Sequence, residues 1–155
     1  MFKQGDRVVY PHHGAGIIEA VQEKCVLSEK REYYILKLPV AQLTINVPVD
    51  NCLQLGLRGV INRPTALKVL RTLSDKARVM PDDSNERYRL NNEKIATGNA
   101  FSLAEVIKDL SEFSVLSSRE KRMLLKAKNL LVSELMHSLE KTETEVTKKV
   151  DKLLN

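Results

Sequence analysis

GDRVVYPHHGAGII, residues 5–18, carries the clearest structural signal in this sequence. Side chains that alternate over residues 7–10 predict a short strand, because successive residues of a strand point to opposite faces. Pro11 lacks a backbone donor and ends the ladder, and Gly14 and Gly16 permit a tight reversal into a second apolar strand. The stretch therefore predicts a hairpin at the start of a small antiparallel sheet.

Strand-like sequence continues beyond this hairpin to about residue 55. Further strands are expected over residues 16–24, 32–38 and 43–47, with turn-prone breaks between them. Four or five short strands in this length bury a core only by curling into a small Tudor/SH3-like antiparallel β-barrel. The side chains expected to point inward are Val8, Tyr10, Ile17, Tyr34, Leu36, Leu43, Ile45 and Val47.

The spacing of apolar residues changes to a helical period after Gly56. Helices are expected over about residues 64–74, from residue 83 or 84 to Gly98, and over residues 103–112. Two capping boxes, Ser117-Ser118-Arg119-Glu120 and Thr142-Glu143-Thr144-Glu145, predict the starts of two more. The expected fold is thus α+β, with the barrel over residues 1–56 and an all-α domain of about five helices over residues 57–155.

The net charge of +5 is unevenly distributed. Residues 1–55 hold six basic side chains (Lys3, Arg7, Lys24, Lys30, Arg31, Lys37) and six acidic ones (Asp6, Glu19, Glu23, Glu29, Glu32, Asp50), so the excess lies in the remainder. A basic domain joined to a neutral one suggests two partners, with the basic part facing a polyanion such as DNA. A solvated basic surface without a partner is the alternative.

Catalytic and metal-binding motifs are not found. Neighbouring His12 and His13 have no accompanying nucleophile or carboxylate arrangement, and Cys25 and Cys52 form no CxxC pair. We therefore expect structural histidines, free thiols, no metal, no cofactor and no enzymatic activity. No stretch approaches the length that spans a bilayer, and the N-terminus lacks a secretory signal, so a cytoplasmic protein with no membrane partner is expected.

Three segments together resemble the CarD family of bacterial transcription regulators. They are the opening hairpin, the run from Glu86 to Gly98, and the string Glu120-Lys121-Arg122-Met123-Leu124. The resemblance extends from Phe2 through the fourth expected helix. It implies a Tudor-like domain, shared with transcription-repair coupling factors, that binds the RNA polymerase β-subunit lobe. It also implies a helical domain that contacts promoter DNA at the upstream edge of the bubble and modulates open-complex stability.

The resemblance also implies where each partner binds. Strand addition to a free sheet edge would hold the polymerase β subunit, with Lys24, Ile45, Asn46 and Val47 as the candidate contacts. Lys24 stands where the family commonly has an arginine, whereas Asn46 occupies a position that is basic in some members. Promoter DNA would be contacted mainly through its backbone and minor groove by Ser84, Arg87, Arg89, Lys94, Lys121 and Arg122.

One departure concerns the start of the second helix. Ser84 aligns with a tryptophan that wedges into the minor groove in well-studied relatives, and this chain has no tryptophan. A serine hydroxyl cannot replace lost base stacking, so a weaker preference for the open complex is expected. From the residues alone, the run from Glu86 to Gly98 is equally readable as a salt-bridged solvent face.

Two other functions remain open at this point. The chain could be an adaptor that binds polymerase without touching DNA, or an RNA- or ribosome-associated Tudor-like protein. Only Tyr10, Tyr33 and Tyr34 are available as stacking aromatics on the barrel, which disfavours the latter. A monomer is expected, and exchange of strands between two copies is the alternative.

Overall fold

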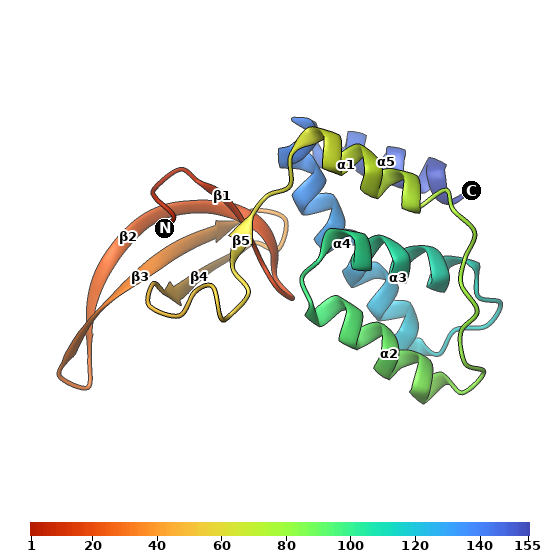
Figure 1. Cartoon of the computed structure of the whole chain (residues 1–155), viewed down its shortest axis with the longest axis horizontal. Helices are drawn as coiled ribbons and strands as arrows, with labels where there is room; N and C mark the ends of the chain where they lie inside the picture. The colour runs from red at the N-terminus through yellow and green to blue at the C-terminus, as the bar shows by residue number, and fades with distance from the viewer.

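The computed structural model describes residues 1–155 and divides them into a sheet lobe and a helical domain that lie side by side (Figure 1). Strands β1 (Arg7–Tyr10), β2 (Gly14–Val26), β3 (Glu29–Leu38), β4 (Leu43–Pro48) and β5 (Arg58–Gly59) form the sheet in the order β4-β3-β2-β1-β5. Every neighbouring pair is antiparallel, and β4 and β5 form the two edges. The expected α+β class is confirmed, with a curved sheet that stays open between these edges.

The core of the sheet lobe corrects part of the expected inward set. Val8, Tyr34, Leu36 and Val47 are buried as expected, together with Ile18, Cys52 and Leu57. Ile17 was expected inward but is 37% exposed, because it pairs with Arg7 on the outer face while Val8 pairs with Gly16. Leu43 does share a face with Val47, but it lies at the first residue of β4, beyond the core, and is 48% exposed.

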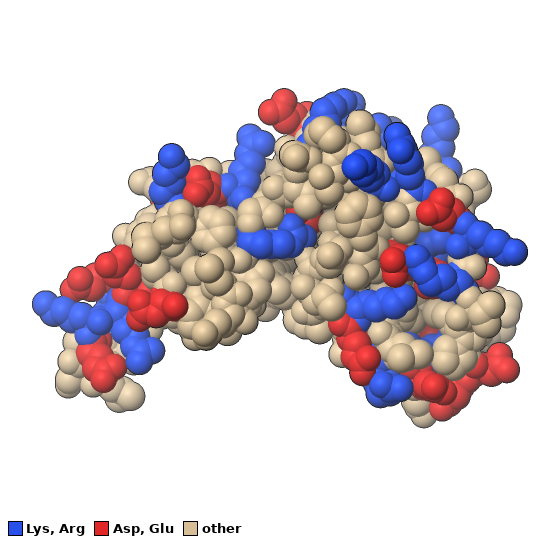
Figure 2. All heavy atoms as spheres, in the orientation of Figure 1, with Lys and Arg blue, Asp and Glu red and all other residues tan.

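A two-stranded arm projects from the sheet. The last strand pair between β3 and β4 is Tyr33 with Pro48, so residues 23–26 and 29–32 have no strand neighbour except each other. Leu27 and Ser28 at the tip both have positive φ angles, 50° and 67°, as the twist of a two-residue hairpin turn requires. Figure 2 shows basic and acidic side chains interspersed along this arm, which gives it no single-sign surface for a polyanion.

The helical domain contains α1 (Arg63–Thr72), α2 (Ser84–Ala96), α3 (Ala100–Glu112), α4 (Ser118–Leu139) and α5 (Glu143–Leu154). Both expected capping boxes are present at the starts of α4 and α5. The third helix begins three residues earlier than expected, because the Asn99 side chain accepts from the backbone N–H groups of Phe101 and Ser102. None of the five helices is long and apolar enough to cross a membrane.

The sheet lobe extends slightly beyond residue 56, where the sequence suggested a boundary. Leu57 fills the core, and Arg58 and Gly59 pair with Val9 and Val8 of β1. The helical domain begins with α1, whose Asn62 cap accepts from the backbone N–H of Thr65. Residues 60–62 therefore form the connection between the two parts.

Candidate nucleic-acid interface

The basic residue expected first on α2 lies inside the helical domain. Arg87 Nε and Nη2 each donate to a carboxylate oxygen of Glu120 at 2.9 Å, and the two side chains are 4% and 0% exposed. The guanidinium also donates to the carbonyls of Pro81 and Asp82 and stacks 4.0 Å above the ring of Phe113. All its donors are directed inward, so the expected DNA contact of Arg87 is not supported by this placement.

Both members of this pair remain charged near neutral pH. Burial alone would raise the pKa of Glu120, but hydrogen bonds from Arg87 and Ser117 outweigh burial and hold that pKa below its ordinary value. The hydrogen bond to Glu120 raises the pKa of Arg87 in turn. Glu120 therefore both caps α4 and neutralises a buried guanidinium.

The other candidate residues of α2 lie on its surface in an acidic or paired setting. Ser84 is half-buried at the first position of α2, among the exposed carboxylates of Asp82, Asp83 and Glu86. Like charges repel, so this end of α2 disfavours a phosphate. Figure 2 shows acidic side chains gathered over this lower end of the helical domain.

Arg89 and Lys94 form salt bridges, as in the alternative interpretation of the run from Glu86 to Gly98 as a salt-bridged solvent face. Arg89 Nη1 lies 2.9 Å from Glu93 Oε1 one turn along the same helix, and Lys94 Nζ lies 3.4 Å from Glu105 Oε2 of α3. Both pairs are partly exposed, and exposed ion pairs contribute at most about 1 kcal/mol. Arg89 and Lys94 thus belong to a salt-bridged face, and α2 offers no unpaired cation.

The first three turns of α4 carry the open positive charge. Arg119, Arg122 and Lys126 are spaced i, i+3, i+7 and so share one face of the helix. All three are exposed, and none takes part in a salt bridge. Lys121 is also exposed, but it is turned about 100° from Arg122 around the helix axis. We call Arg119, Arg122 and Lys126 the α4 basic stripe.

The sequence reading found only part of this stripe. Arg122 was expected, whereas Arg119 and Lys126 were missed, although their spacing is visible in the sequence. Arg119 is held in place, because its guanidinium stacks 3.7 Å above the Tyr88 ring and donates to Asn85 Oδ1 at 3.1 Å. The stripe therefore combines one ordered guanidinium with two unpaired cations.

A groove separates the stripe from the sheet lobe. It encloses about 320 Å³ and lies between α4 and two turns and the start of β4 in the sheet lobe. Its lining residues are His12, His13, Val40, Ala41, Leu43, Arg122, Leu125, Lys126, Asn129, Leu130 and Ser133. We call it the interdomain groove. A second hollow of about 310 Å³ shares His12, Arg122 and Lys126 with it and continues past Arg119 to Tyr88 and Asn92.

The two histidines at the groove have different environments. His13 Nδ1 lies 3.0 Å from the Pro11 carbonyl oxygen, and its ring stacks on Tyr10, as expected of a structural turn residue. The pKa of His12 is lowered by partial burial, then by the charge of Lys126 and by His13. His12 therefore leaves most of the positive charge of this region to the stripe.

The candidate polymerase contacts lie on a different part of the molecule. Ile45, Asn46 and Val47 all belong to β4, an edge strand, and are half-buried, exposed and buried respectively. Lys24 lies on the arm, where it pairs with Arg31 of β3. Arg31 is two positions before Tyr33, the last residue of β3 that pairs with β4. The structure thus places three of the four residues on one free edge and the fourth on the adjoining arm.

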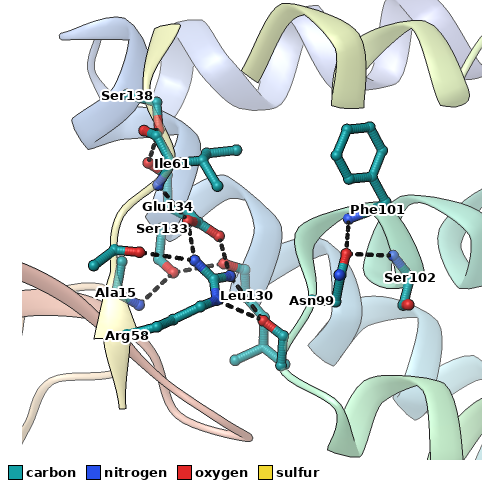
Figure 3. Close-up of polar contacts among 12 residues, drawn as sticks. Ala15, Arg58, Ile61, Asn99, Phe101, Ser102, Leu130, Ser133, Glu134 and Ser138 are labelled. Carbon is teal, nitrogen blue, oxygen red and sulfur yellow. Dashed lines mark hydrogen bonds and ion pairs between the residues drawn. The ribbon is translucent and has the colours of Figure 1, made fainter. Parts of the chain in front are cut away.

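An ion pair with a buried carboxylate fixes the sheet lobe to the helical domain (Figure 3). Arg58 Nη1 and Nη2 donate to the two carboxylate oxygens of Glu134 at 2.6 and 2.7 Å, and the Glu134 side chain is 1% exposed. Arg58 also donates twice to the carbonyl of Gly98, and Ile61 N–H donates to Glu134 at 2.9 Å. We call this arrangement the Arg58–Glu134 clasp.

A second contact between the two parts lies beside the groove. Ala15 N–H donates to Ser133 Oγ at 2.9 Å, and that hydroxyl donates to the carbonyl of Leu130 (Figure 3). Gly14 has a φ of +95°, and a Cβ atom there would lie only 2.7 Å from Ser133 Oγ. Glycine is therefore required for β2 to approach α4 this closely.

Comparison with known proteins matches a family model to each part of the chain. The family model of the CarD-like/TRCF RID domain matches residues 2–61, and that of the CarD C-terminal domain matches residues 68–151. The chain is 36% identical over 140 residues to YdeB of Bacillus subtilis (strain 168), a candidate transcription factor by its name. That match covers 87% of this chain and 90% of YdeB.

Proposed function

Because this chain belongs to the CarD family and carries its RNA-polymerase-interacting domain, we propose that it acts at the start of transcription by holding polymerase and promoter DNA together. The family assignment itself indicates a transcription-related protein that interacts with RNA polymerase. In the proposed arrangement the β4 edge binds the polymerase β-subunit lobe, and the α4 basic stripe contacts promoter DNA at the upstream edge of the bubble. These contacts modulate the stability of the open complex.

The observation that carries the proposal is the α4 basic stripe. A cation already paired with a carboxylate must give up that partner to bind a phosphate, whereas Arg122 and Lys126 have none to give up. Phosphate contacts position a protein on DNA without reading its sequence. The proposed contact therefore centres on Arg119, Arg122 and Lys126, with Lys121 beside them, rather than on α2.

Strand addition supports the polymerase contact. β4 has one neighbour in the sheet, so its outer edge is free to pair with an extended segment of the β-subunit lobe. Asn46 is exposed on this strand, and Lys24 lies on the arm beyond it. Main-chain hydrogen bonds would supply most of the affinity, and these side chains would adjust it.

Charge at position 46 is expected to adjust the affinity for polymerase. Because basic residues favour this contact in the family, Asn46→Lys should tighten binding and Asn46→Asp should weaken it, each about threefold, the effect of an exposed charge pair. Titration of labelled protein with RNA polymerase measures both. Gln4→Asp, at an exposed position before β1 and outside β4, is the control and should bind as the parent does. Equal affinities for all four proteins would remove β4 from the proposed interface.

The lifetime of an open promoter complex tests the function as a whole. A factor shifts an equilibrium only as far as it prefers one state, so a protein that prefers the open complex extends its lifetime. We expect a longer lifetime with the parent and no extension with Arg122→Gln/Lys126→Gln. Ser84→Trp should extend it further, because an indole replaces lost base stacking.

The control pair lies on α2, where Arg89→Gln/Lys94→Gln removes two cations that are already salt-bridged. This variant should retain most of the parent's effect. Salt provides a second readout, since each phosphate contact contributes about 0.9 to the slope of log affinity for duplex DNA against log salt. Loss of Arg122 and Lys126 should flatten that slope by about 2. Polymerase binding with no salt-dependent DNA affinity would favour the adaptor without DNA contact.

A further inference from the structure

The interdomain groove combines exposed apolar side chains with positively charged ones. Leu43 and Leu125 both line the groove and are 48% and 61% exposed, so they leave apolar surface in contact with water there. Arg122 and Lys126 line the same groove and have no carboxylate partners. A ligand that satisfies the whole groove must therefore carry an anionic group beside an apolar surface.

The charge of the groove is entirely of one sign. No aspartate or glutamate lines either the groove or the second hollow that continues from it. Asn129 adds an amide that can both donate and accept, which suits the edge of a nucleobase. His12 and His13 add imidazole rings, a side-chain type on which unstacked bases are found.

The groove is formed before any ligand arrives. One wall comes from the sheet lobe and the other from α4, and the Arg58–Glu134 clasp and the Ala15–Ser133 hydrogen bond hold these walls together. Its volume of about 320 Å³ lies at the lower end of the range for pockets that bind small ligands. Such a volume suits one nucleotide rather than a folded partner.

Duplex DNA satisfies only part of this chemistry. Its phosphates can reach Arg122 and Lys126, but its bases are stacked and paired inside the helix, so Leu43 and Leu125 would stay in contact with water. An unpaired nucleotide presents its phosphate and a bare base face together. The second hollow, which ends at Arg119 and Tyr88, gives the adjoining phosphate of the same strand a place to bind.

We infer that the interdomain groove binds one unpaired nucleotide of single-stranded DNA. The base lies on Leu43 and Leu125, and the flanking phosphates contact Arg122 and Lys126. The inference rests on the proposed function, because a melted promoter is where this chain would meet such a strand. It adds a preference for single strands to a surface otherwise assigned to the DNA backbone.

The test compares two labelled DNA molecules, a short single strand and the duplex of the same sequence. Leu125→Gln removes exposed apolar surface without touching the core or the cations. We expect it to weaken binding of the single strand about tenfold, in keeping with the burial of most of one leucine side chain. Its effect on the duplex should be several times smaller. Leu67→Gln, an equally polar change on the exposed face of α1, is the control and should change neither affinity.

The outcomes separate this inference from the function beneath it. If Arg122→Gln/Lys126→Gln weakens duplex binding while Leu125→Gln affects both DNA forms equally or neither, DNA contact stands and the nucleotide site is refuted. If the parent binds neither form of DNA, both the nucleotide site and the proposed DNA contact are refuted. A free nucleoside triphosphate that binds as tightly as the single strand would make the groove a small-molecule site. An RNA strand that binds more tightly than the DNA strand would overturn the assignment to DNA.

Discussion

Arg87→Met is expected to lower the free energy of unfolding of the helical domain by about 3–5 kcal/mol, because it leaves the fully buried Glu120 carboxylate without its cation. Methionine keeps much of the volume of the arginine stem, so the loss is mainly one of charge and hydrogen bonds. A domain of this size is typically stable by only about 5–15 kcal/mol. Urea denaturation followed by circular dichroism measures the difference.

The pH dependence of this loss has a definite sign. In the parent the pKa of Glu120 is lowered by folding, so its contribution is present above the unfolded pKa and is lost as pH falls through the folded pKa. In Arg87→Met only burial and the cap act, and burial favours the neutral acid. Protonation then relieves the variant as pH falls toward the unfolded pKa of a glutamate, and below that pKa the parent loses its own contribution from the pair. The stability gap between parent and variant should therefore narrow over both ranges of pH.

Arg89→Met is the matched control for this pair. It lies two residues away on the same helix, but its salt bridge is exposed, so its effect should stay within about 0.5 kcal/mol. Combining Arg87→Met with Glu120→Leu should recover part of the loss, since no charge is then left buried. If Arg87→Met were no more destabilising than Arg89→Met, Glu120 would have to be hydrated, and the Arg87–Glu120 pair would contribute nothing to the free energy of unfolding.

The second large effect is expected at the join between the two parts. Arg58→Met leaves Glu134, 1% exposed, without its guanidinium and removes both donors from the Gly98 carbonyl. We expect a loss of about 2–4 kcal/mol, somewhat less than for Arg87 because Arg58 is partly exposed. The loss should uncouple the two parts, so that a single calorimetric unfolding transition of the parent becomes two.

Arg71→Met provides the control for the clasp, because Arg71 is exposed in the last turn of α1 and enters no salt bridge. It should leave the transition unchanged. Hydrogen exchange gives an independent readout, since the Ile61 and Ala15 amides both bond across the join and should exchange faster in Arg58→Met. Unchanged protection at both amides would show that packing of β2 on α4 holds the two parts without the clasp.

Local features of this chain were readable from the sequence. The two capping boxes are confirmed because a cap depends on residues only three positions apart. The prediction of which side chains point into the core was right for Val8 and Tyr34 but wrong for Ile17. The turn at His12 fixes which residue of β2 pairs with Arg7, and this pairing decides the face on which Ile17 lies. The two-residue β5 has no alternation of its own and exists only because β1 pairs with it.

The ion pairs between residues far apart in the chain could not be predicted from the sequence. Arg87 and Glu120 are separated by 33 positions, and Arg58 and Glu134 by 76. A basic residue on a helix looks the same in the sequence whether it faces DNA or a buried carboxylate. Arg87 was therefore placed on the surface, whereas the spacing of the α4 basic stripe is local and could have been found.

The clasp gives the molecule the properties of a rigid bivalent ligand. Linking two binding sites makes the second binding event intramolecular, with an effective concentration that depends on whether the link matches the span between the sites. The connection over residues 60–62 is short, and the Arg58–Glu134 clasp beside it removes most of the rotational freedom that a flexible tether would allow. A chain docked through β4 would then present its α4 basic stripe at one distance and one angle. DNA at that position would be bound more tightly because of the docking, whereas DNA held elsewhere on the polymerase would be bound no more tightly than without it.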